Sequence, residues 1–249
     1  MNGTFLVRCL VLAMAASAGT AAGADPSDHW LARWSFDAVE DHQVPDVSGH
    51  GHPGQMRALE AGAGPTLVDG MVGKAVRLRA ALGTDVRVQR HDRLNPTTGL
   101  TIAAWIKHEG PIDSSAEILG KKGQARYIVD GYRFYVSRTR SLCLEIGDGA
   151  AVSRVQTERK TIREDTWYFV AATFSPGRVR LYVNARLVVD EPVPARQIAP
   201  STNHLVLGNF AGRRNAFPFN GLIDEVSLLD AALDADAIFA LARPSELRE

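Results

Sequence analysis

The stretch that decides the fold lies at residues 167–184 and reads WYFVAATFSPGRVRLYVN. Its first half, residues 167–174, is apolar at both odd and even positions, as expected for a strand that is covered on both faces. The turn-forming sequence SPG follows at 175–177, and residues 178–184 then alternate between apolar and other side chains. The stretch therefore predicts two successive strands joined by a tight turn.

Other parts of the chain repeat this pattern of short alternating runs separated by turns. Such runs are found at 100–107 (LTIAAWIK), 132–137 (YRFYVS) and 142–146 (LCLEI). Period two over short segments is typical of an antiparallel two-sheet sandwich or jelly roll. Because no internal repeat or low-complexity linker divides the chain, we predict an all-β protein in which residues 25–249 form a single domain.

One helix is predicted, near the C-terminus. Asp234 is a suitable N-cap, and Leu233 and Ile238 are spaced as a hydrophobic staple. Ile238 and Leu241 form an apolar stripe, and Pro244 is expected to end the helix. We expect this helix to pack on the edge of the sandwich.

The overall charge and cysteine content exclude several protein classes. The 249 residues include 28 basic and 28 acidic side chains, so the formal net charge is +0. This balance gives no electrostatic basis for binding nucleic acid or an anionic membrane. The 2 cysteines are too few for a disulfide-rich scaffold.

Residues 1–24 have the features of a secretory signal peptide. They contain one charge, Arg8, then an apolar run at 9–16 and small residues that end in Ala22-Gly23-Ala24. The run is shorter than the roughly 20 residues that span a bilayer, although an uncleaved anchor is the alternative. We therefore expect cleavage before Asp25 and a secreted, periplasmic or cell-envelope location with no membrane span. The only cysteine left would be Cys143, which we expect to be a buried, unreactive thiol.

Several motifs in order resemble one family. They are WSFD (34–37), DVSGHGH (46–52), GKAVRL (73–78), LTIAAWIK (100–107), the pair at 165–174 and 179–184, and FNGLIDEVSLLDAAL (219–233). Together they resemble the laminin G-like jelly-roll family within the concanavalin A-like lectin/glucanase fold, over residues 30–243. The resemblance implies two stacked, curved antiparallel sheets.

The resemblance also implies a structural calcium ion. The matching positions are Asp37, the carbonyls around Gly51 and His52, and Asp224. Asp224 shares its strand parity with apolar residues, so its carboxylate must be paired, hydrogen-bonded or bound to a metal. The alternative is that Asp224 only accepts hydrogen bonds from backbone amides.

Two groups of residues are candidates for binding a ligand. The first lies in the segment 209–219 and comprises Asn209, Arg213, Arg214 and Asn215, in which the arginines suit acidic groups. The second comprises Arg133 and Tyr135, which have the opposite parity from the apolar residues of their strand. For the loop, the alternative is that it is simply solvated.

No catalytic motif is present. Glucanases of this fold carry paired carboxylates on one strand as E-x-D-x-E or E-x-D-x-x-E, and the pairs Glu145/Asp148 and Asp224/Glu225 lack that spacing. We therefore predict a non-catalytic module that binds an extracellular carbohydrate. The alternatives are a protein-binding or cell-envelope structural or adhesion module, and an unrecognised polysaccharide-active enzyme.

Overall fold

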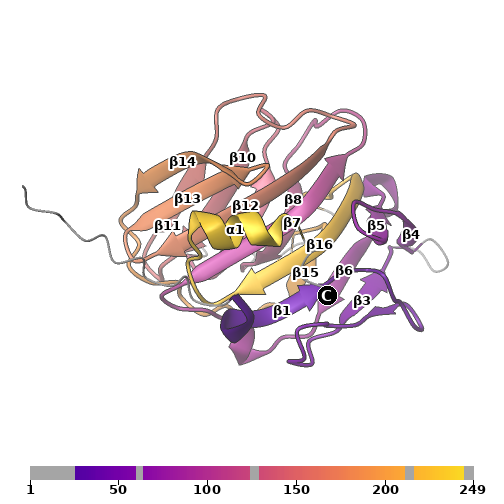
Figure 1. The fold of residues 1–249 in the computed structure, drawn as a ribbon, viewed down its shortest axis with the longest axis horizontal. Coiled ribbons are helices and arrows are strands. Elements are labelled where there is room, and N and C mark those ends of the chain that lie inside the picture. The colour runs from indigo at the N-terminus through magenta and orange to yellow at the C-terminus, as the bar shows by residue number, and fades with distance from the viewer. Residues whose placement is uncertain (1–25, 60–63, 124–128, 211–215, 244–249) are drawn as a thin grey trace, which may run out of the picture.

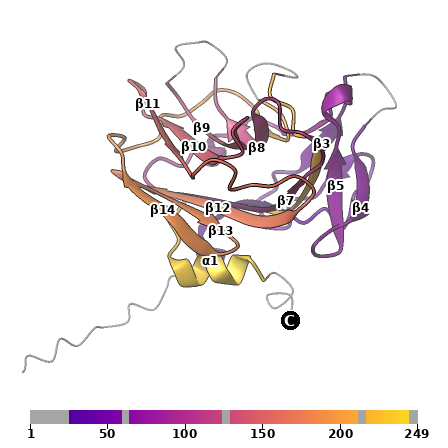
Figure 2. The same cartoon turned by 90° about the horizontal axis from the view of Figure 1, so that it is seen from above.

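A computed structural model describes residues 26–59, 64–123, 129–210 and 216–243. Within these ranges the chain forms two antiparallel sheets that stack face to face (Figures 1 and 2). The predicted all-β sandwich is therefore confirmed. The predicted signal peptide lies outside the described residues.

The first sheet contains eight strands. In spatial order they are β14 (Arg186–Pro192), β13 (Arg178–Val183), β12 (Trp167–Ser175), β7 (Leu100–His108), β16 (Gly221–Leu229), β5 (Lys74–Leu78) and β4 (Thr66–Asp69), with β1 (Trp30–Trp34) pairing with β16. Strands distant in the sequence are neighbours here, since β16 lies between β7 and β5.

The second sheet also contains eight strands. Their order is β11 (Val152–Gln156), β10 (Leu142–Gly147), β9 (Tyr132–Val136), β8 (Ala116–Lys121), β15 (Leu205–Leu207), β6 (Asp85–Val88), β3 (Gly54–Arg57) and β2 (Gln43–Val44). Short 3₁₀ turns are formed by Pro26–His29, Ala80–Leu82 and Asp92–Leu94.

The stretch at 167–184 forms β12, a turn and β13, as the sequence predicts. Val170, Ala172 and Phe174 face the core between the sheets. Phe169 and Ala171 face the opposite way, into a second apolar cluster. This second cluster explains why β12 is apolar on both faces.

The helix α1 (Ala235–Leu241) covers that second cluster. Asp234 caps it, as predicted, by accepting a hydrogen bond from the Ala237 amide at 2.9 Å. The helix lies on the outer face of the first sheet (Figures 1 and 2). Its Ile238 and Leu241 side chains belong to the second apolar cluster. The expected position at the sandwich edge was wrong, because the apolar outer side chains of β7, β12 and β13 provide a face for the helix to bury.

None of the helices in the described ranges is long and apolar enough to cross a membrane.

Candidate functional site

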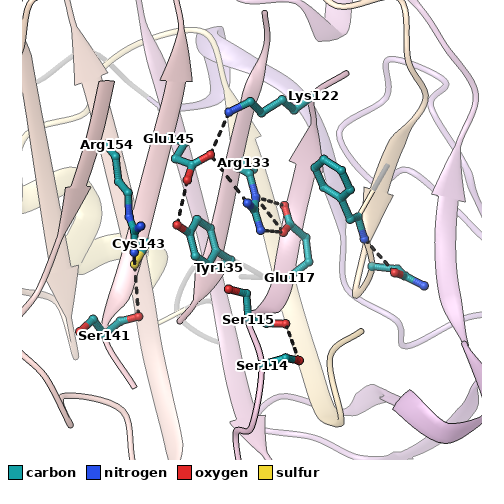
Figure 3. Close-up of polar contacts among 12 residues, drawn as sticks. Ser114, Ser115, Glu117, Lys122, Arg133, Tyr135, Ser141, Cys143, Glu145 and Arg154 are labelled. Atoms are coloured by element: carbon teal, nitrogen blue, oxygen red, sulfur yellow. Dashed lines mark hydrogen bonds and ion pairs between the residues drawn. The ribbon is translucent and has the colours of Figure 1, made fainter. Parts of the chain in front are cut away.

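A row of polar side chains crosses the outer face of the second sheet, from β8 to β11. Along β9, Tyr132, Phe134 and Val136 belong to the core. Arg133 and Tyr135 point to the other face, in agreement with their sequence parity, and lie among charged residues of neighbouring strands (Figure 3). We call this row, which consists of Glu117, Lys122, Arg133, Tyr135, Glu145 and Arg154, the polar strip.

Arg133 lies at the centre of the polar strip. Its Nη2 and Nε donate hydrogen bonds to Oε2 of Glu117 at 2.8 and 3.1 Å. Its Nη1 lies 3.7 Å from Oε2 of Glu145. The guanidinium therefore links a carboxylate from β8 to one from β10 across the intervening strand (Figure 3).

Glu145 is the second anchor of the strip. Lys122 Nζ donates to its Oε2 at 2.8 Å, and the Tyr135 hydroxyl donates to its Oε1 at 2.9 Å. Charge-assisted hydrogen bonds of this kind fix side-chain geometry more firmly than neutral ones. Five residues of the strip, from Glu117 to Glu145, therefore form a connected, pre-organised network, and the Arg154 guanidinium lies 5.7 Å from the ring centroid of Tyr135.

Aromatic rings cover the Arg133 guanidinium. Its carbon lies 4.0 Å from the ring centroid of Tyr135, 5.1 Å from that of Phe210 and 4.9 Å from that of Phe217. Phe210 and Phe217 belong to the predicted ligand loop at 209–219, so this loop packs against the strip. The described part of this loop thus lies beside Arg133 and Tyr135, the second group of predicted ligand residues.

The loop residues themselves are only partly described. Asn209 is fully buried, and its Oδ1 accepts a hydrogen bond from the Phe210 amide at 2.9 Å. Its Nδ2 is buried with no partner among the described residues. Arg213, Arg214 and Asn215 lie outside the described residues.

The pKa values of the two carboxylates in the strip, Glu117 and Glu145, are shifted in opposite directions. Burial raises the pKa of Glu117 to about 7, although Arg133 opposes the change. Burial also acts to raise the pKa of Glu145, but Lys122 and Arg133 outweigh it and the net shift is downward. Divergent pKa values are typical of acid–base pairs, yet Glu117 is 0% exposed and bound to Arg133. In this arrangement Glu117 is a structural partner of Arg133.

The strip reaches solvent at β11. Arg154 is exposed there, and its Nη2 donates to Oε1 of Gln156 at 2.9 Å. Cys143 on β10 lies next to Arg154, with its sulfur 3.8 Å from Nη2. It is a buried free thiol whose pKa is raised by burial, as expected for an unreactive cysteine.

The sequence alone did not indicate Glu117 and Lys122. Glu117 follows Ala116 at the start of a strand whose alternation is interrupted by a bulge between Glu117 and Leu119. The available signal for Glu117 was a charged residue directly before the apolar pair Ile118-Leu119.

The residues of the predicted calcium site are divided between two places. Asp224 Oδ2 accepts hydrogen bonds from the Met71 and Val72 amides at 2.9 and 3.0 Å. Asp37 Oδ1 accepts from the amide of Lys74 at 2.8 Å. Both acids therefore bind the turn that connects β4 and β5.

Gly51 and His52 have other roles. The His52 carbonyl accepts a hydrogen bond from Trp34 Nε1 at 2.9 Å, and its amide donates to Asp46 Oδ2 at 2.9 Å. Gly51 has φ +77°, which favours glycine in this turn.

The fit of these residues to a cation depends on the oxygens that Asp224 has free. Burial raises the pKa of Asp224 to about 7, and amide donors occupy both of its oxygens. Across the described ranges, no group of three or more His, Cys, Asp or Glu side chains is placed to hold a metal. As arranged, both acids accept hydrogen bonds from backbone amides, and calcium binding stays a prediction.

Comparison with known families agrees with this architecture. Residues 82–239 match the model of the family described as the concanavalin A-like lectin/glucanases superfamily, of the laminin G type. The chain belongs to this family. No curated protein sequence matches it.

Two solved structures of similar fold are binding domains of toxins. The binding domain of Paraclostridial Mosquitocidal Protein 1 superimposes with a TM-score of 0.65 at 17% identity, covering 89% of this chain and 53% of that one. The botulinum neurotoxin serotype G binding domain gives a TM-score of 0.66 at 12% identity, covering 87% of this chain and 51% of that one. The chain therefore spans about half the length of these two toxin domains.

A third structure matches over nearly its full length. It is domain 4 of AbnA, a GH43 extracellular arabinanase from Geobacillus stearothermophilus, solved in complex with arabinotriose. It gives a TM-score of 0.65 at 20% identity, covering 86% of this chain and 98% of that domain. At these identities the likeness shows the fold.

Proposed function

We propose that this protein is an exported, non-catalytic module that binds an extracellular carbohydrate at the exposed end of the polar strip. The observation that carries the proposal is the strip itself, a pre-organised polar network beside which Arg154 and Gln156 are exposed and hydrogen-bonded to each other. Carbohydrate hydroxyls act as both donors and acceptors. A guanidinium next to a side-chain amide offers both kinds of partner in fixed positions.

The fold relatives support the choice of ligand. One of them was solved with arabinotriose, and the cell entry of botulinum neurotoxin type C was described as dependent on two ganglioside molecules. Fold alone does not give function, so the proposal for this chain depends on the chemistry of the strip.

A glycan array tests the proposal, with calcium and with chelator. We expect the wild type to bind at least one polysaccharide, and Arg154→Ala to weaken that binding about tenfold, the equivalent of about 1.4 kcal/mol. Arg186→Ala is the matched control, because Arg186 is exposed on β14 of the other sheet. Failure to bind any glycan would overturn the proposal and favour a protein-binding or envelope module.

A separate measurement tests the alternative that the protein is a polysaccharide-active enzyme. Reducing-sugar release from a panel of polysaccharides should remain at the background level of a heat-denatured sample. Release that depends on Glu117 or Glu145 would show that the module is an enzyme.

A further inference from the structure

A second surface feature, separate from Arg154, gathers positive charge. It is a hollow of about 360 Å³ lined by the β9–β10 turn, the segment after β11 and the loop before β8. The first two contribute the cations Arg138, Arg140, Arg159 and Lys160. We call these four residues and their hollow the basic hollow.

Backbone hydrogen bonds hold the two walls of the basic hollow together. The Lys160 amide donates to the Thr139 carbonyl at 2.9 Å, and the Ile162 amide donates to the Arg140 carbonyl at 3.0 Å. The Ile162 side chain is fully buried in the core. The cations are therefore attached to a fixed frame, which reduces the ordering needed when a ligand binds.

The charges in the basic hollow are not balanced locally. Arg140 is engaged, because its Nη1 lies 2.7 and 3.0 Å from the two oxygens of Glu164. Asp113 is the only acid in the lining. Within the described parts of the chain, no ion pair or side-chain hydrogen bond holds Arg138, Arg159 or Lys160, all of which are exposed. A chain of net charge +0 thus carries a concentrated positive surface here.

The backbone at two of these cations has an uncommon conformation. Arg140 and Lys160 have φ of 61° and 62°, in the left-handed region that favours glycine or asparagine. A long cationic side chain at each position strains the backbone where glycine would not.

We propose that the basic hollow binds the sulfate or carboxylate group of an acidic glycan. Arginine and lysine are suited to such oxyanions, and the hollow opens to the surface, so a charged group carried on a sugar chain can reach it. A nucleic acid is disfavoured, because the residues that line the hollow include no aromatic ring on which bases would stack. The carbohydrate nature of the ligand rests on the proposed function, whereas anion binding does not.

The test is binding of a sulfated oligosaccharide and of an oligouronate, measured by calorimetry at 50 and 300 mM salt. We expect binding that weakens at the higher salt, because the cations are exposed and screened. The double variant Arg159→Ala/Lys160→Gly should weaken it about tenfold, as two exposed charge contacts are lost. Its fold should be at least as stable in thermal melting, since glycine relieves the strain at 160.

Arg90→Ala/Arg186→Ala is the matched control, since it removes the same charge from exposed sites elsewhere. Equal weakening by both double variants would overturn the proposal in favour of non-specific attraction. Tighter binding of a single-stranded DNA oligomer than of both acidic glycans would also overturn it. Loss of neutral-glycan binding in Arg154→Ala concerns the polar strip alone, so the two proposals fail separately.

Discussion

Replacing Arg133 with methionine is expected to destabilise the fold by about 3–5 kcal/mol, because it leaves a buried carboxylate without its cation. Glu117 is 0% exposed, and Arg133 donates to its Oε2 at 2.8 and 3.1 Å. The Arg133 side chain is itself only 10% exposed. Water therefore has little access to Glu117 and cannot replace the lost hydrogen bonds. The expected destabilisation is that of a broken buried ion pair, which is larger than that of an exposed pair.

Equilibrium unfolding in urea at pH 8 measures this loss of stability. The double variant Arg133→Met/Glu117→Leu is the control, because replacing both partners with apolar groups removes the unpaired charge. It should recover most of the stability lost in Arg133→Met. A loss below about 1 kcal/mol in the single variant, the range of an exposed pair, would refute the reasoning.

The loss of stability caused by Arg133→Met should depend on pH. Burial raises the pKa of Glu117 to about 7 from an ordinary value of 4.5. The folded state then binds the Glu117 proton more tightly than the unfolded state does. The stability that this proton contributes is fully present below pH 4.5 and is lost as the pH rises through 7. Arg133 lowers the pKa of Glu117. When Arg133 is removed, this pKa rises further, and the loss of stability therefore continues to higher pH. The destabilisation by Arg133→Met should therefore be smaller at pH 5 than at pH 8, and an equal destabilisation would contradict the buried-charge explanation.

Two further predictions concern other sites. Added calcium should raise the melting temperature of the wild type but not of Asp224→Ala, and a wild-type melting curve unchanged by chelator would exclude the structural calcium. Lys121 is fully buried, and its Nζ donates to Asn95 Oδ1 at 2.7 Å and to the Ser201 carbonyl. Burial lowers the pKa of Lys121 from 10.5 to about 8. Between pH 8 and pH 10.5 the unfolded state therefore binds more protons than the folded state, so stability should rise with pH in this range. Urea midpoints at pH 8 and 10 should show this rise in the wild type and its absence in Lys121→Met; an identical rise in both would contradict it.

Local patterns were enough to predict much of the fold. Alternation along 132–137 placed Arg133 and Tyr135 on the face opposite the core, because successive strand side chains must point to opposite faces. Asp234 identified the start of α1, since a capping carboxylate acts within one turn of the helix. The double-sided apolar pattern of β12 showed that something covers its outer face, but it did not show that α1 is the cover.

Pairing between distant segments decided the rest. Glu117 meets Arg133 because β8 and β9 are neighbours in a register that includes a bulge, which no local periodicity specifies. The basic hollow likewise forms where a hairpin turn and a later segment are joined by the hydrogen bonds of Lys160 and Ile162. The sequence by itself determined the strands, the helix cap and the side-chain parity, since these follow from neighbouring residues. Only the tertiary structure decided which charges become partners and which remain unpaired at the surface, because strand order and register bring them together.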